Sequence, residues 1–271
     1  MNQVFLGDIA IPKDGLIKVE YPNFFSDKLL IGNLEGPLLN NTQNEHKKFK
    51  TFNDFKAIKS VFNEKKVVFN ICNNHIFDDE NLSETLKNLN RLGIKYFGAG
   101  ENLNKASEPF IDHKRKVFIM AFGWNINGCK YATKFTKGVN PMINNYVISN
   151  VKKYKNKYKG YRSIVFFHWN YELELYPQPY HRKLSHDLAG LGIDLVIGAH
   201  PHRISGFEII NNTPILYSIG NFIFPDDFFF NGKLNFPSFC KLQLAFELDV
   251  NGNHKCHFFK YKKSENIIKY L

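Results

Sequence analysis

The sequence predicts an α/β fold, because short apolar runs alternate with amphipathic helical segments along the chain. The apolar runs are rich in β-branched and aromatic residues and show no polar alternation, which is typical of strands buried on both faces. Each run also ends in polar residues instead of a neutral turn. Open α/β sheets collect ligand-binding groups just past the carboxyl ends of their strands, so this last observation also predicts a functional site.

The expected elements follow in chain order. Strands are predicted at residues 4–6, 29–31, 67–72, 164–167, 195–198 and 215–219. Amphipathic helices are predicted at residues 54–65, 80–92, 142–158 and 180–191. Gly93 and Gly192 follow two of these helices, at the place where a helix end favours a left-handed residue.

Composition indicates a globular chain, and its cysteines are expected to be reduced thiols. The 271 residues are 44% hydrophobic, enough to bury a large core, and no linker, repeat or low-complexity segment divides them, so a single domain over residues 1–271 is expected. The four cysteines form no Cys-x-x-Cys pair. No apolar run is long enough for a membrane span, and the first residues lack the features of a signal peptide. We therefore expect a cytoplasmic protein without an integral membrane segment.

The net charge of +11 favours an anionic substrate or partner without naming it. Basic stretches at residues 152–159 and 260–263 are interpreted as solvated surface in a lysine-rich protein, and a nucleic-acid partner is not expected. The Phe228–Phe229–Phe230 run has two open interpretations, an exposed contact surface or a bent core segment.

Oxygen and nitrogen ligands recur at the predicted strand ends. The set consists of Asp8, Glu35, Asn74, His75, His168, His200 and His202. Borderline divalent metals such as Zn, Mn, Fe or Ni accept such mixtures, and two of them side by side could activate a hydroxide and neutralise a phosphoryl group. In His200–Pro201–His202 the rigid proline places two imidazoles in one tight turn, which favours ligation.

Each of these residues also has an ordinary structural interpretation. A single histidine at a strand end is more often hydrogen-bonded than metal-bound, Asp8 could cap a turn, and Glu35 could pair with a lysine. Their joint placement at strand ends favours the metal site. The other histidines without a partner motif are expected to face solvent: His46, His113, His254 and His257.

The ordered motifs resemble the bacterial capsule-synthesis family typified by the poly-γ-glutamate capsule protein CapA. The first half contributes Gly7–Asp8, the run from Gly32 to Pro37, the run from Asn73 to Asp78, and Gly98–Ala99–Gly100. The second half contributes the runs from Phe167 to Glu172, from Gly192 to His202, and from Tyr217 to Phe222. The resemblance covers roughly residues 4 to 225, and the ordered combination is more specific than any single motif.

That family is similar to the calcineurin-like metallophosphoesterases, which implies a four-layer α-β-β-α sandwich with a two-metal site between the sheets. By this resemblance, Asp8 and His202 bind one metal, Asn74, His168 and His200 bind the second, and Glu35 takes the place of the bridging carboxylate. His75 resembles the imidazole that assists the leaving group. Glu172 lies in a His-Trp-x-x-Glu stretch and is expected to face substrate.

Three departures from the family patterns bear on this expectation. Ala10 stands where the phosphoesterases usually have a histidine, Asn33–Leu34–Glu35 replaces the usual Gly-Asp pair, and Asn170 stands where the capsule family commonly has glycine. The first metal is therefore expected to have fewer strong ligands.

The sequence is compatible with two functions. The first is a cytosolic metal-dependent phosphoesterase-like hydrolase that acts on an anionic intermediate of capsule or surface-polysaccharide synthesis, alone or with other capsule-synthesis proteins. The second is a non-catalytic accessory subunit that binds a polymer or a synthase. Metal content distinguishes the two.

Overall fold

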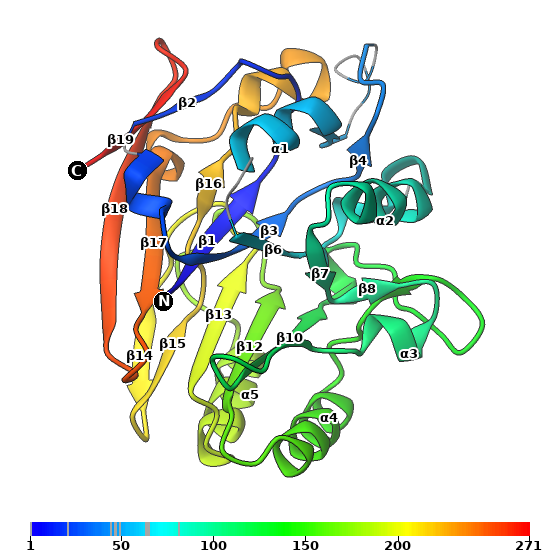
Figure 1. Cartoon of the computed structure of the whole chain (residues 1–271), viewed down its shortest axis with the longest axis vertical. Coiled ribbons are helices and arrows are strands. Elements are labelled where there is room, and N and C mark those ends of the chain that lie inside the picture. Colours follow the sequence, from blue (N-terminus) through cyan, green and yellow to red (C-terminus); the bar gives the residue numbers. More distant parts are fainter. Residues whose placement is uncertain are drawn as a thin grey trace.

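The structure is a computed structural model that describes residues 2–20, 22–43, 45, 48, 50–62, 66–80 and 82–271. Two β-sheets occupy its middle, and helices lie outside them (Figure 1). His46 lies outside the described residues, so the expectation for it is not tested.

The larger sheet combines a parallel half with an antiparallel half. From edge to edge it contains β2 (Lys18–Val19), β19 (Ile267–Tyr270), β18 (His254–Lys262), β17 (Leu242–Leu248), β1 (Gln3–Ile9), β3 (Leu29–Leu34), β6 (Lys66–Asn70) and β7 (Lys95–Phe97), and β16 (Asn221–Ile223) pairs with β1. The pairs among β1, β3, β6 and β7 are parallel, whereas β17, β18 and β19 run antiparallel.

The smaller sheet is parallel at its centre. It contains β14 (Phe207–Ile210), β15 (Thr213–Leu216), β13 (Leu195–Ala199), β12 (Arg162–His168), β10 (Val117–Gly123) and β9 (Phe110–Asp112) in that order. Two small ribbons pair β4 (Leu38–Leu39) with β5 (Asn53–Asp54), and β8 (Ala99–Gly100) with β11 (Gly138–Val139).

Helices connect the parallel strands. The α-helices are α1 (Phe55–Phe62), α2 (Leu82–Arg91), α3 (Leu103–Ala106), α4 (Asn144–Lys157) and α5 (Pro179–Gly190). Short 3-10 turns are η1 (Pro22–Phe25), η3 (His75–Glu80), η4 (Asn125–Asn127), η5 (Asp226–Phe228), η6 (Phe230–Gly232) and η7 (Ser238–Lys241). No helix among the described residues has the length and hydrophobicity needed to cross a bilayer.

Strand β10 shows how the layers pack. Its alternate residues Val117 and Ile119 belong to the core between the two sheets, while Phe118 and Met120 face the second core, which contains Val147 of α4 and Leu184 of α5. Alternation with period two places successive side chains on opposite faces of a strand. Helices α4 and α5 therefore cover the outer face of the smaller sheet (Figure 1), and the predicted four-layer α/β sandwich is confirmed.

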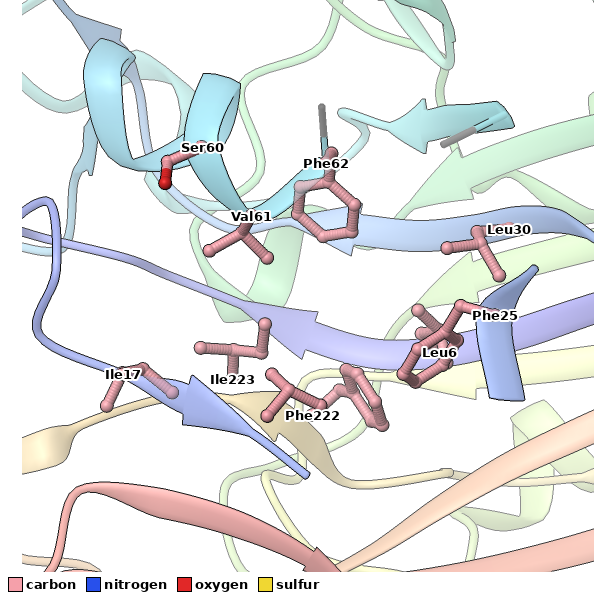
Figure 2. Close-up of a pocket in the computed structure, with 10 residues that line it drawn as sticks. Leu6, Ile17, Phe25, Leu30, Ser60, Val61, Phe62, Phe222 and Ile223 are labelled. Carbon is pink, nitrogen blue, oxygen red and sulfur yellow. The ribbon is translucent and has the colours of Figure 1, made fainter. Parts of the chain in front are cut away.

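An apolar cavity of about 220 Å³ lies between α1 and the larger sheet (Figure 2). Leu6 and Leu30 of the sheet and Phe62 of α1 form part of its wall, and Ser60 is the one polar side chain among its described lining residues. None of the predicted metal ligands lines it. The cavity is thus a packing feature separate from the strand ends that carry the ligand-type residues.

The predicted elements and the observed ones agree closely, apart from some strand ends. The six predicted strands and four predicted helices are all present, although β6 ends at Asn70 instead of residue 72 and β15 ends at Leu216 instead of residue 219. Gly93 and Gly192 adopt φ values of +66° and +72°, as expected for helix ends. His257 was expected to face solvent and is buried, because the imidazole bridges Glu247 of β17 and the hydroxyl of Tyr270 of β19.

Candidate metal centre

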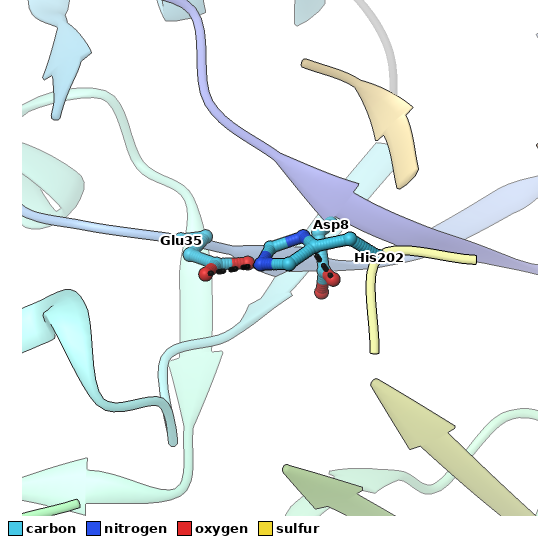
Figure 3. A group of neighbouring side chains, drawn as sticks. All are labelled: Asp8, Glu35 and His202. Atoms are coloured by element: carbon cyan, nitrogen blue, oxygen red, sulfur yellow. Dashed lines mark ion pairs between the residues drawn. The ribbon is translucent and has the colours of Figure 1, made fainter. Parts of the chain in front are cut away.

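Three buried side chains from different strands converge at the carboxyl ends of the parallel strands (Figure 3). Asp8 lies near the end of β1, Glu35 directly follows β3, and His202 follows β13. Their ligand atoms all lie within 4.8 Å of one another. The His202 Nδ1 atom is 3.3 Å from Asp8 Oδ2, and His202 Nε2 is 3.6 Å from Glu35 Oε1.

The Glu35 carboxylate is the unusual member of this group. The residue is fully buried, and neither carboxylate oxygen accepts a hydrogen bond from any described residue. Its backbone is held in place, because Asn53 Nδ2 donates to the Glu35 carbonyl at 2.9 Å. A buried carboxylate that accepts no hydrogen bond is costly, and its ion-pair partner, the His202 ring, is 3.6 Å away, so the position favours a cation beside the carboxylate.

A second group adjoins the first. His168 Nε2 lies 2.7 Å from Asn74 Oδ1, and the His168 and His200 rings have centroids 4.8 Å apart. His200 Nδ1 has no hydrogen-bond partner among the described residues, while its backbone N–H donates to Asp8 Oδ2 at 3.3 Å. The backbone of His200 therefore joins the two groups.

The electrostatics differ between the two groups. Burial lowers the pKa of His168 and His200 well below the ordinary histidine value, and their neighbouring imidazoles lower both further, so both rings are neutral and able to coordinate a metal. Burial also lowers the pKa of His202, but Glu35 and Asp8 outweigh it and raise that pKa to about 10. Burial, then the Asp8 charge, raises the pKa of Glu35 well above its usual range. The negative charges of Asp8 and Glu35 therefore favour a cation at this point.

Backbone conformation directs the two imidazoles of the His-Pro-His turn. His200 and His202 adopt φ values of +95° and +56°, a left-handed region that residues with a side chain rarely adopt. Such conformations persist where the surrounding structure determines them, and they are common at functional sites. The turn after β13 is therefore built to present both rings inward.

Two asparagines that the sequence interpretation gave no role also belong to this region. Asn33 Nδ2 donates to Asp8 Oδ1 at 2.8 Å and lies 3.5 Å from His168 Nδ1. Asn221 Oδ1 lies 2.8 Å from His202 Nδ1, which fixes the orientation of that ring. The sequence could have indicated both asparagines by their position. Asn33 precedes Glu35 by two residues, and Asn221 follows a predicted strand.

His75 and Glu172 lie outside the buried cluster. His75 is partly exposed in η3, with Nδ1 2.8 Å from Asp78 Oδ2. Glu172 is exposed in the loop after β12. The negative charges of Glu172 and Asp78 contribute to the raised pKa of Glu35, after burial and the Asp8 charge.

Ala10 is buried in an aromatic cluster instead of a ligand set. Its neighbours in this cluster include Phe224, Phe229 and Phe236, and the His202 ring stacks on Phe236 with centroids 4.6 Å apart. Of the Phe228–Phe229–Phe230 run, Phe229 is fully buried there and the other two are half-buried. Apolar packing therefore occupies the side of the site where a histidine would have been an additional ligand.

Comparison with known proteins identifies the family. The model of the family described as bacterial capsule synthesis protein PGA_cap matches residues 20–226. The chain belongs to this family. The PGA_cap chain is 28% identical over 204 residues to the capsule biosynthesis protein CapA of Bacillus anthracis, covering 71% of this chain and 49% of that protein. It is 27% identical over 245 residues to the PGA biosynthesis protein CapA of Bacillus subtilis, covering 83% of this chain and 63% of that protein.

Other relatives carry a different description. A probable polyglutamine synthesis accessory protein of Mycobacterium tuberculosis is 26% identical over 171 residues, which is 58% of this chain and 44% of that protein. The PGA_cap chain thus spans between about half and under two thirds of the length of its CapA relatives. A hypothetical protein of Thermus thermophilus shares the fold, with a TM-score of 0.54 at 14% identity, covering 96% of this chain and 99% of that one.

Proposed function

We propose that this PGA_cap protein is a metal-dependent, phosphoesterase-like hydrolase that acts on an anionic intermediate of capsule or surface-polymer synthesis. The observation that carries the proposal is the buried Glu35 carboxylate, which has no donor and lies beside Asp8 and His202. Carboxylate, imidazole and amide oxygen together form a ligand set suited to Zn, Mn, Fe or Ni.

The chain offers ligands for two divalent ions. Asp8, His202 and Glu35 would hold one, and Asn74, His168 and His200 would hold the other. By the family resemblance, Glu35 would also bridge to the second ion. When bound, such ions lower the pKa of water and neutralise charge on a phosphoryl group. Asn33 and Asn221 orient Asp8 and His202 for this purpose through their hydrogen bonds.

His75 is assigned to the leaving group. Its Nδ1 atom lies 2.8 Å from Asp78 Oδ2, which orients the ring and leaves Nε2 pointing away from that carboxylate. The partly exposed position of His75 allows contact with a substrate. Glu172 is assigned to the substrate, because it is exposed in the loop that follows His168.

A phosphoester hydrolysis assay tests this function. The purified chain loaded with Mn, Zn, Fe or Ni is expected to hydrolyse p-nitrophenyl phosphate or its bis-ester, and His200→Ala is expected to abolish the activity while the circular dichroism spectrum stays unchanged. His113→Ala is the matched control, because His113 is exposed on the opposite part of the smaller sheet beside β9. Absence of turnover with all four metals, in protein shown to be folded, would refute the proposal.

A second function, the non-catalytic accessory subunit, is favoured by Ala10. The aromatic cluster around Ala10 removes a ligand position, and one group of relatives is named for an accessory role. This function predicts a chain that purifies with little metal and gains no thermal stability when metal is added. Elemental analysis with a melting curve therefore separates it from the hydrolase.

A further inference from the structure

A groove of about 710 Å³ lies where the parallel strands of the larger sheet begin, at the other end of these strands from the candidate metal centre. Its lining includes Leu29 at the start of β3, Lys66 at the start of β6 and Lys95 at the start of β7. Helix α1, the connection from α2 to β7, and β9 with the turn after it supply the remaining lining. A groove of this volume has the size of a small-molecule site.

The floor of this groove is apolar. Ile58 of α1 and Val68 of β6 are buried in it, while Phe55, Leu92 and Ile94 are half-buried and keep part of their surface accessible. Apolar surface left open in a groove favours a ligand with an apolar part, because covering that surface removes it from water.

The rim of the groove is strongly basic. The lining contains five cationic side chains and one carboxylate, which are Lys59, Lys66, Arg91, Lys95, Arg115 and Asp112. Asp112 pairs with Arg115, so the carboxylate is already neutralised. Lys59, Arg91 and Lys95 form no ion pair with any residue that the structure describes. The groove therefore presents unneutralised positive charge above an apolar floor.

Arg91 is held in place without losing its charge. Its Nη1 atom donates to Asn40 Oδ1 at 2.8 Å and to Asn88 Oδ1 at 3.2 Å, and both acceptors are neutral. The guanidinium also lies 4.6 Å from the centroid of the Phe55 ring. The Nη2 and Nε groups donate to no described residue, so they remain available to an anion.

Helix ends explain only part of the basic rim. Lys59 and Arg91 lie in the last turns of α1 and α2, where a cation offsets the helix dipole. Lys66 and Lys95 each begin a strand and have no helix end to offset. A solvated lysine-rich surface would also need no apolar floor beneath it. Charge and floor together therefore favour a ligand.

We propose that this groove binds an anionic amphiphile, a molecule with a phosphate head and an alkyl chain. Several cations on one rim suit the two negative charges of a phosphate monoester, and the apolar floor accommodates the chain. The inference stands apart from the proposed hydrolase function, because the groove and the candidate metal centre lie at opposite ends of the parallel strands.

Calorimetric titration tests the proposal. The full chain, treated with a chelator, is titrated with decyl phosphate below its micelle concentration, and saturable binding is expected. Decyltrimethylammonium has the same chain with the opposite charge, and inorganic phosphate has no chain, so each should bind more weakly by about tenfold or more. Absence of saturable binding of decyl phosphate, or equal affinity for the cationic amphiphile, overturns the proposal.

Charge-reversal variants locate the site. Lys59→Glu combined with Lys95→Glu is expected to weaken decyl phosphate binding by about tenfold or more. Lys152→Glu combined with Lys159→Glu is the matched control, because it changes the net charge equally at exposed positions on α4 and just after it. Melting curves check that both variants are folded. Equal weakening in the two double variants would contradict binding in the groove.

Vesicles distinguish a membrane lipid from a free amphiphile. The chain is floated with vesicles of phosphatidic acid in phosphatidylcholine. Co-flotation that only the Lys59 and Lys95 reversals abolish supports the proposal with a lipid headgroup as the source. Decyl phosphate binding without co-flotation supports it with a free amphiphile as the source. Co-flotation without decyl phosphate binding overturns it. Because no metal or turnover is involved, these results are independent of the phosphoester assay.

Discussion

Other buried carboxylates among the described residues accept hydrogen bonds, which makes Glu35 distinctive. Asp226 is fully buried and accepts hydrogen bonds from the Phe236 N–H and Lys241 Nζ, both at 2.6 Å. Glu247 accepts from Lys28 Nζ at 3.0 Å and meets His257 Nε2 at 2.8 Å. Glu35 has no such donors among the described residues. The same chain therefore supplies hydrogen-bond donors to its structural carboxylates and none to this one, which suits a metal ligand.

Glu208 provides a pH-dependent test at the residue scale. Its carboxylate pairs with the Arg182 guanidinium at 2.9 and 2.7 Å and accepts from the Tyr217 hydroxyl at 2.7 Å. These partners, with Arg182 the strongest, lower the pKa of Glu208 to about 2 from an ordinary 4.5. Its contribution to stability is therefore complete above pH 4.5 and is lost as the pH falls toward 2.

Glu208→Gln is expected to lower the free energy of unfolding by about 1 kcal/mol at neutral pH. Urea unfolding of both proteins between pH 7 and about pH 3 measures the difference, which should shrink below pH 4.5. A difference that stays constant across this range would contradict the assigned role of the Glu208 ion pair.

At the scale of the elements, the close approach of two strands requires a glycine at position 7. A Cβ atom on Gly7 would lie 1.8 Å from the Gly220 carbonyl oxygen, where β1 and the chain entering β16 meet. In the register of this pair, Asp8 lies opposite Asn221. The absence of a side chain at Gly7 therefore lets the Asp8 strand approach the strand that orients His202.

Gly7→Ala is expected to separate β1 from β16, to destabilise the fold by about 3 kcal/mol, and to weaken metal binding. Chemical denaturation and metal titration measure the two effects. Gly190→Ala at the end of α5 is the matched control, because a Cβ atom there has no neighbour within 4 Å, and it should be neutral or slightly stabilising. Equal behaviour of the two variants would refute the packing argument.

The elements differ in how well their sequence patterns predicted them. The parallel strands β1, β3, β6, β12 and β13 are continuous apolar runs, because both of their faces are covered. Strand β18 alternates between exposed and buried residues over most of its length, because one of its faces meets water. It therefore offers no continuous run, and the antiparallel extension of β17, β18 and β19 was not predicted.

At the scale of the whole molecule, the candidate metal centre joins the two sheets. Asp8 and Glu35 come from the larger sheet, whereas His168, His200 and His202 come from the smaller one. Metal bound between them would stabilise the packing of one sheet on the other, since an ion that binds only the folded state adds to its stability.

Addition of Mn or Zn to chelator-treated protein is therefore expected to raise the melting temperature by roughly 5 °C or more at about one hundred times the dissociation constant. Differential scanning calorimetry measures the shift, and Asp8→Asn should reduce it strongly. His113→Ala should retain it, because His113 is exposed beside β9. A shift of equal size in Asp8→Asn would assign the effect to another site.

The sequence by itself determined the α/β class, the order of the parallel strands along the chain, and the residue types that gather at their ends, because these depend on local patterns of apolar and polar residues. Only the tertiary structure decided which of them meet. It placed Asp8, Glu35 and His202 together, added Asn33 and Asn221, and surrounded Ala10 with aromatic rings. Contacts between residues almost two hundred positions apart, such as His200 with Asp8, depend on how two sheets pack. No local pattern encodes that packing.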